Sequence, residues 1–293
     1  MSNQSFLSMA DSGKNSLWRY VLGVILIVFT WMVISAVLGV AAMSSAPSVQ
    51  AALTLLGFLS MLVMPLVVTR VLHGRPAGTL IGPAQRLNWG RIGRAMLVWA
   101  RLMIAAVIAE MLWKGLSSYR LNVDNFLSNL ATIFMYIFLI PIQATAEEVF
   151  FRGYLLQATG RLTRNWVILG IINSLFFMLP HLSNPEVETA GIVLAGLNWL
   201  ASGMFYTLLT LRSGSLDYAI GAHVINNVLS ATLIGYPGGA LGEIALVMAK
   251  ELDAAFGLVT FVMASVIAHV ALTRGTTDAS TQLTAAQRAE AAS

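Results

Sequence analysis

The sequence predicts an all-α fold, a polytopic membrane helix bundle of about eight transmembrane helices. Of its 293 residues, 57% are hydrophobic and only 10% are charged, whereas a soluble domain carries about 25% charged residues. The apolar residues also form long runs without polar alternation. Each backbone polar group inside a bilayer must be satisfied within its own segment, so these runs predict helices and not the strands of a barrel.

Eight apolar stretches are predicted to cross the ~30 Å hydrocarbon core of a bilayer. They run from Trp18 to Met43, Val49 to Val68, Ala95 to Trp113, Phe126 to Phe151, Trp166 to Leu179, Val187 to Leu211, Leu216 to Ile234 and Ala254 to Thr273. Residues 17–273 are therefore predicted to form a single membrane-embedded domain. The polar segments 1–16 and 274–293 are expected to be a disordered N-terminus and a disordered tail.

Basic residues are concentrated in alternate loops of this arrangement. Five arginines lie between the second and third spans, and Arg161 and Arg164 lie between the fourth and fifth. The loop after the fifth span instead carries Glu186 and Glu188. The positive-inside rule then predicts that both termini are cytoplasmic. The net charge of +4 reports this topology, and no nucleic-acid partner is predicted.

The fourth span contains the residues that are hardest to place in a membrane. Glu147, Glu148 and Arg152 stand in an apolar run, where an ionisable group costs at least ~2.5 to 3.5 kcal/mol. Glu148 and Arg152 are four residues apart on one helix face and are predicted to form an ion pair. Glu147 then needs a partner on another helix. Pro141 is expected to kink the helix before these carboxylates.

The fifth span offers that partner. Asn173, Phe177 and His181 recur every four residues and so occupy one helix face. A helical hairpin centred near Arg164 places His181 and Glu147 at similar depth, because each lies 17 residues from the turn. Glu147 and His181 are therefore predicted to meet.

The seventh span carries a second polar pair, His223 and Asn227, which are also four residues apart. Because this span is expected to start at the cytoplasmic side, the pair is predicted to lie in the cytoplasmic half of the bilayer, as is Glu147. The Gly-rich stretch from Gly235 to Asp253 follows as an outer loop. Within it, Glu243 to Ala249 is expected to form a short interfacial helix.

Together these side chains suit the hydrolysis of a peptide bond. Such a reaction needs a base that activates water and donors that stabilise the oxyanion. A glutamate can be the base, a histidine can orient it or carry its proton, and an Asn amide with a His N–H can bind the oxyanion. An ion pair that only specifies the fold is the alternative explanation of the fourth span alone. The converging set is Glu147, Glu148, Arg152, His181, His223 and Asn227.

In these residues the sequence resembles the CAAX prenyl endopeptidase and bacteriocin-processing (CPBP/Abi) family of intramembrane proteases, as a bacterial-type member. The family motifs EExxxR, FxxxH and HxxxN read here as Glu147 to Arg152, Phe177 to His181 and His223 to Asn227. The resemblance implies a catalytic core at about residues 126–234. It also implies that Glu147 and His181 activate water, that His223 and Asn227 bind the oxyanion, and that Glu148, Arg152 and Phe177 support the site.

A zinc-dependent protease with Glu147, His181 and His223 as ligands is the main alternative. Catalysis without a cofactor is preferred, because Arg152 occupies Glu148 and Asn is a poor zinc ligand. The chain has no cysteine, which excludes thiolate chemistry. A non-catalytic immunity or transport protein is the alternative of another class, although a transporter should show paired broken helices in two repeated halves.

The expected partners are a membrane-associated peptide or protein substrate and the lipid bilayer. Because the chain is Ala-rich and uses Arg more than Lys, the expected location is the cell membrane of a bacterium, its inner membrane. The sequence leaves the substrate and the oligomeric state open.

Overall fold

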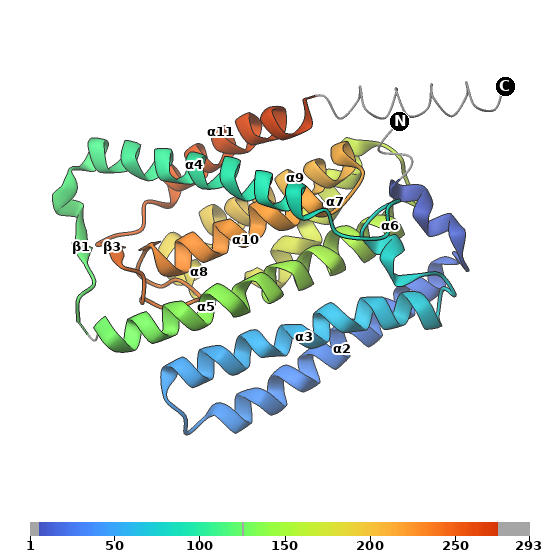
Figure 1. The fold of residues 1–293 in the computed structure, drawn as a ribbon, viewed down its shortest axis with the longest axis horizontal. Helices are drawn as coiled ribbons and strands as arrows, with labels where there is room; N and C mark the ends of the chain where they lie inside the picture. Colours follow the sequence, from blue (N-terminus) through green and yellow to red (C-terminus); the bar gives the residue numbers. More distant parts are fainter. Residues whose placement is uncertain (1–5, 125, 275–293) are drawn as a thin grey trace.

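The structure, a computed structural model, describes residues 6–124 and 126–274. Its long helices pack into one bundle, so the predicted all-α membrane fold is confirmed (Figure 1). They are α2 (Leu17–Ala42), α3 (Pro47–Val71), α4 (Trp89–Lys114), α5 (Phe126–Glu147), the π-helical segment η4 (Glu148–Leu155) with α6 (Leu156–Thr159), α7 (Trp166–His181), α9 (Ile192–Ser213), α10 (Asp217–Thr232) and α11 (Ala254–Thr273).

Each of the eight predicted spans coincides with a helix of this bundle. In the described part of the chain, six helices are long and apolar enough to cross a membrane, with α5, η4 and α6 counted as one helix of 34 residues. The other two predicted spans are α7 and α10, which have 16 residues each. The sixth predicted span is divided at Gly191, whose φ of 77° separates the short helix α8 (Glu186–Ala190) from α9. Glycine adopts such a φ without steric cost.

The bundle has two distinct ends. We call one the strand end, because α8 and the strands β1 (Tyr119–Leu121), β2 (Ile234–Gly235) and β3 (Val247–Ala249) lie there. The opposite end carries α6, and we call it the α6 end. The short helix η1 (Met9–Ser12) and the last turn of α11 both lie at the α6 end (Figure 1). The chain thus enters and leaves on the same side, as an even number of spans requires.

The residues of η1 and those just before it pack onto the α6 end. Phe6, Leu7 and Ala10 are buried, and Asp11 Oδ1 lies 2.9 Å from Arg161 Nη1. Disorder was predicted for residues 1–16 because the segment is polar overall, but its few apolar side chains cover the end of α6. Residues 1–5 and 275–293 lie outside the described residues.

The strand end differs from the prediction. The stretch from Glu243 to Ala249 was expected to be helical. Instead, residues 243–246 are irregular, and the extended stretch Val247–Ala249 is β3, the central strand of a small sheet of order β1-β3-β2. β3 pairs antiparallel with β1 and parallel with β2. So short a helix is marginal in isolation, whereas the extended stretch finds backbone partners on both sides.

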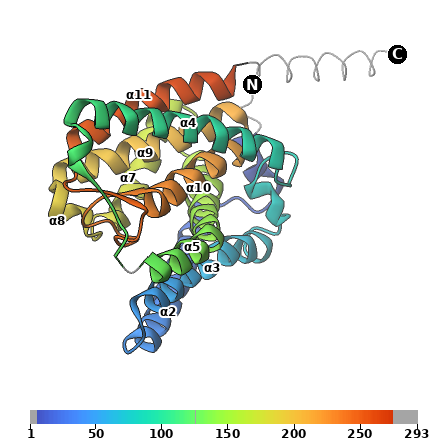
Figure 2. The same ribbon diagram turned by 60° about the vertical axis from the view of Figure 1, so that its left-hand side comes forward.

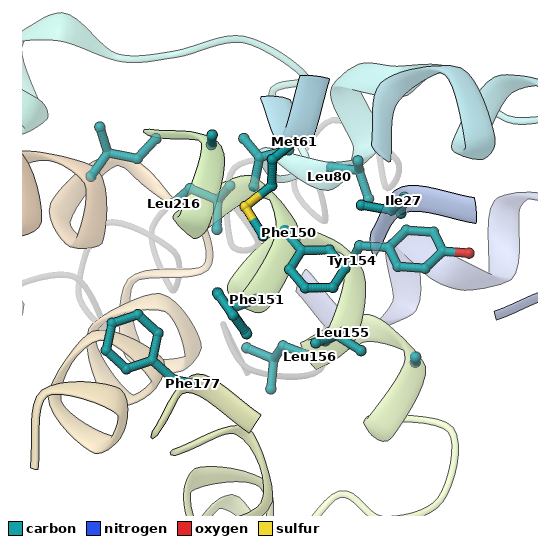
Figure 3. Packing of buried hydrophobic residues seen from close by; sticks show 14 of the residues in the cluster. Ile27, Met61, Leu80, Phe150, Phe151, Tyr154, Leu155, Leu156, Phe177 and Leu216 are labelled. Atoms are coloured by element: carbon teal, nitrogen blue, oxygen red, sulfur yellow. The ribbon is translucent and has the colours of Figure 1, made fainter. Parts of the chain in front are cut away.

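The hairpin of α2 and α3 packs against α5 and projects from one side of the bundle (Figure 2). Its inner residues meet η4 in the largest buried apolar cluster. There Ile27 and Met61 pack with Phe150 and Tyr154 of η4, as the close view shows (Figure 3). The hairpin therefore supports the segment that carries Glu148 and Arg152.

Two polar contacts tie the same segment to the α6 end. His73 Nε2 lies 2.9 Å from the Tyr154 hydroxyl, and Gln157 Nε2 donates to the backbone carbonyl of Thr79 over 2.8 Å. His73 and Thr79 belong to the loop between α3 and α4. The helix formed by α5, η4 and α6 is thus anchored beyond Glu148 and Arg152, which limits how far it can shift or rotate.

Candidate active site

Glu148 and Arg152 form the ion pair that their spacing predicts. Arg152 Nη1 lies 2.8 Å from Glu148 Oε1, and both side chains are fully buried. The guanidinium lies over the ring of Phe177 at 4.3 Å and that of Tyr206 at 5.2 Å. Its Nη2 donates to the Gly203 carbonyl over 3.4 Å. These contacts hold the arginine in one place. Breaking such a buried ion pair would leave an uncompensated charge.

The helix that carries this pair is not a regular α-helix. It continues as an α-helix through Pro141 and becomes π-helical from Glu148 to Leu155. π-helical turns are rare and are frequently found at functional sites. The sequence analysis expected a kink at Pro141 and did not foresee this wider turn.

His223 of α10 contacts both carboxylates. Its Nδ1 lies 2.7 Å from Glu148 Oε1, and because an ionised carboxylate only accepts, Nδ1 must carry the hydrogen. Its Nε2 then faces Glu147 Oε2 at 3.6 Å, slightly beyond hydrogen-bond distance. Tyr206 of α9 stacks on the imidazole with a centroid distance of 4.7 Å. Glu148 and Tyr206 therefore fix the orientation of His223 and direct Nε2 at Glu147.

Glu147 has one occupied oxygen and one free oxygen. Gln143 Nε2, one turn earlier on α5, donates to Glu147 Oε1 over 2.6 Å. Glu147 Oε2 is buried and has no hydrogen-bond partner among the described residues, although the side chain is only 5% exposed. A buried carboxylate oxygen normally finds a donor. Glu148 Oε2 is also buried without a partner among the described residues, but of the two glutamates only Glu147 lines the cavity described below.

His181 does not contact Glu147 as the sequence analysis predicted. Its Nδ1 lies 2.7 Å from the Phe177 carbonyl, and its ring packs against Phe177 at 4.5 Å and Trp199 at 5.6 Å. Phe177 in turn packs against Phe151, so His181 and Glu147 do lie at similar depth on antiparallel helices. The contact is missing because His181 bonds back to its own helix, and His223 takes its place beside Glu147.

Gln143 is a site residue that the sequence analysis missed. Besides holding Glu147, its Oε1 accepts a hydrogen bond from Asn227 Nδ2 over 3.1 Å. It thereby links the glutamate of α5 to the Asn of α10. The sequence did contain one indication of this role: Gln143 is a polar residue in an apolar helix, four positions before Glu147. Tyr206 gave no comparable indication, because an aromatic residue is common in an apolar span.

A partly open cavity of about 740 Å³ connects these residues. Its wall includes four predicted catalytic side chains and Gln143. From there it extends to the strand end, where Tyr119, Tyr236 and Ala249 also line it. The cavity is large enough to admit a segment of peptide, and it brings that segment to the free oxygen of Glu147. The side chains in its wall that the sequence predicts to be catalytic are Glu147, His181, His223 and Asn227.

Comparison with known proteins finds one matching family. Residues 127–229 match the family model of the Rce1-like type II CAAX prenyl endopeptidases. Over this region the chain is similar to these endopeptidases. The matched region runs from α5 into α10 and contains all three motifs, so the resemblance predicted from the sequence is confirmed.

A bacterial protein is also similar to the chain. The uncharacterized protein YyaK of Bacillus subtilis (strain 168) is 36% identical over 180 residues, which cover 61% of this chain and 59% of YyaK. The alignment thus spans less than two thirds of that relative. No solved structure gives a significant match to the chain.

The donor set that the zinc alternative requires is not assembled among the described residues. Among the described residues, no three His, Asp or Glu side chains lie together in a way that fits a metal ion. Glu148 already accepts from Arg152 and His223, and His181 Nδ1 bonds to backbone. As they lie here, Glu147, His181 and His223 do not fit a tetrahedral zinc site.

Proposed function

We propose that the protein is an intramembrane endopeptidase that hydrolyses a peptide bond of a membrane-associated peptide or protein. The observation that carries the proposal is the buried, unpartnered Oε2 of Glu147 beside His223, in the wall of a cavity large enough for a peptide. The family match over residues 127–229 supports the same reaction class. Glutamate is basic enough to act as a general base when positioned against a water molecule.

In the proposed reaction, Glu147 removes a proton from water as the water oxygen bonds to the scissile carbonyl carbon. The tetrahedral intermediate carries its negative charge on the former carbonyl oxygen. As the carbon–nitrogen bond breaks, Glu147 returns the proton to the leaving amine nitrogen. His223 Nε2 faces Glu147 Oε2 and supports this proton movement. His181, which lines the same cavity, is proposed to orient the water.

The oxyanion is proposed to be bound by Asn227, together with His223 when Nε2 of that ring also carries a hydrogen, since Nδ1 already donates to Glu148. Asn227 Nδ2 donates to Gln143 in the structure, so the amide is already ordered by the residue that holds Glu147. Preorganised donors stabilise the developing charge without reorganising during the reaction.

Replacing Asn227 by alanine is expected to lower the turnover rate about a hundredfold or more, the usual effect of losing one oxyanion donor. Asn226→Ala is the comparison variant, because Asn226 Oδ1 accepts from Trp99 Nε1 on α4 and Asn226 acts on Asn227 only through a hydrogen bond from its Nδ2 to Asn227 Oδ1. Its effect on turnover should be smaller. Steady-state cleavage of a peptide by the two purified variants tests this, and equal losses would contradict the assignment of Asn227.

We propose that hydrolysis needs no metal ion, because the glutamate and histidine can activate water by themselves. Cleavage is then expected to survive stringent chelation of the purified protein. The measurement is peptide cleavage after chelation, combined with elemental analysis of the protein. Loss of activity that zinc restores, together with stoichiometric bound zinc, would contradict this proposal and support the metalloprotease alternative.

The proposed location is the cell membrane of a bacterium, with the α6 end facing the cytoplasm. Arg161 and Arg164 lie in the loop after α6, and the strand end carries Glu186 and Glu188, as the positive-inside rule requires of that orientation. The function is tested by comparing the termini of membrane peptides in cells that express the wild type or Glu147→Gln. New termini that need Glu147 support a protease, whereas identical sets would favour a non-catalytic role.

A further inference from the structure

The cavity that contains the catalytic residues is acidic. Among the described residues, five carboxylate side chains line it, and neither lysine nor arginine does. Most of them lie toward the strand end, away from Glu147. They are Glu110, Glu147, Glu186, Glu251 and Asp253. A cleft lined by charges of one sign attracts ligands of the other sign.

Two of these carboxylates already have a cation, and two do not. Lys114 Nζ lies 3.1 Å from Glu110 and 2.9 Å from Asp253, which neutralises much of their charge. Glu186 and Glu251 have no ion pair with any described residue. These two are therefore the carboxylates available to a positively charged ligand.

Glu186 is held in place with one oxygen free. Its Oε1 accepts from the Ala240 backbone N–H over 2.9 Å and from the Tyr236 hydroxyl over 3.5 Å. Burial, together with the neighbouring Glu186, raises the pKa of Tyr236, so that hydroxyl stays protonated and keeps donating. Glu186 Oε2 is buried and has no hydrogen-bond partner in the described part of the chain. A preoriented, unsatisfied carboxylate oxygen suits a charged N–H donor.

Two further observations point to a ligand in this cavity. Glu147, 5% exposed, presents a second unpartnered carboxylate oxygen deeper in the same cavity. The rings of Tyr119, Trp199 and Tyr236 also line it, and aromatic faces attract ammonium and guanidinium groups. Carboxylates and aromatic rings together are the surroundings that favour a cation.

We propose that the cavity selects peptides that carry a positive charge between the scissile bond and the strand end, and that Glu186 and Glu251 bind this charge. The charged group is an ammonium or guanidinium, from a lysine or arginine side chain or from a free peptide amino terminus. This inference rests on the proposed endopeptidase function and names the substrate class. In the proposed orientation, the charged segment lies on the outer side of the membrane.

Binding to the full-length Glu147→Gln protein in detergent tests the proposal without requiring hydrolysis. The probes are three fluorescent apolar peptides of one sequence: acetylated with one lysine, acetylated with glutamine in its place, and unacetylated with that glutamine. At least one charged peptide is expected to bind about tenfold more tightly than the neutral one, the typical effect of a charge-assisted hydrogen bond. Added salt should reduce the difference.

Single carboxylate-to-amide variants then test which side chains cause the preference for a charged peptide. Glu186→Gln and Glu251→Gln should each weaken binding of the preferred charged peptide about tenfold and leave the neutral peptide unaffected. Glu188→Gln is the matched control, because Glu188 lies on the same short helix as Glu186 and does not line the cavity. It should change neither affinity.

Equal affinities of the three peptides, or equal effects of the Glu186 and Glu188 variants, would overturn the proposal. If Glu186→Gln disturbs its loop, Glu251→Gln decides alone, since Glu251 is exposed. A comparison of the two charged peptides shows whether the group is a side chain or an amino terminus. Failure of cleavage by the wild type would instead count against the protease function, because charge-selective binding does not depend on hydrolysis.

Discussion

Replacing Glu147 by glutamine is expected to abolish peptide cleavage, with a loss of at least about 10²- to 10⁴-fold if Glu147 is the general base. Glutamine keeps the size of the side chain and an oxygen that can accept from Gln143, as Glu147 Oε1 does. It loses the basic oxygen beside His223. The fold should therefore be retained while the base is removed.

The measurement is cleavage of a peptide by the purified protein in detergent, together with its thermal unfolding. Unfolding should be unchanged in Glu147→Gln, and substrate should still bind. Glu188→Gln, at the strand end and outside the cavity, should retain full activity. If Glu147→Gln cleaves normally while Glu148→Gln is folded and inactive, the base has been assigned to the wrong carboxylate.

Replacing Glu148 by glutamine is expected to destabilise the protein by roughly 3 to 5 kcal/mol, because it strands a buried cation. Arg152 is fully buried, and Glu148 is its ion-pair partner. The same change weakens the acceptor of His223 Nδ1, so activity should fall as well. Glu148→Gln thus acts on stability and on the site, whereas Glu147→Gln acts on the chemistry.

A double variant separates these two effects. Glu148→Gln with Arg152→Gln removes both charges, so it should regain stability relative to Glu148→Gln alone. Its activity should stay low, because His223 Nδ1 still faces the weaker glutamine acceptor in place of Glu148. Thermal unfolding in detergent and peptide cleavage are measured for the single and double variants. A double variant less stable than Glu148→Gln would show that the pair is not the reason for the loss.

The membrane fold and the local geometry of the motifs could be predicted from the sequence. Span positions follow from the length of the apolar runs, which depends only on bilayer thickness. The pairing of Glu148 with Arg152 follows from four-residue spacing on one helix, and the structure has it at 2.8 Å. The span positions and this ion pair each depend on one segment only, so both can be derived from the sequence without a structure.

The contacts between helices were decided by the tertiary structure. Which histidine faces Glu147 depends on the rotation of α7 and α10 about their axes and on competing bonds such as that of His181 to Phe177. The helical spacing of each motif does not contain that information. The linking role of Gln143 likewise arises only where α5 meets α10.

Contacts between distant segments also explain why the sequence did not predict the strand end or the burial of the first described residues. Val247–Ala249 is a strand because Tyr119–Leu121, far away in the sequence, supplies its backbone partners. Phe6 and Leu7 are buried because the α6 end offers them an apolar surface. Sequence by itself determined which segments enter the membrane and which charges pair within a helix. The packing of distant segments determined which side chains meet in the cavity, because that depends on free energies of contact that no single segment contains.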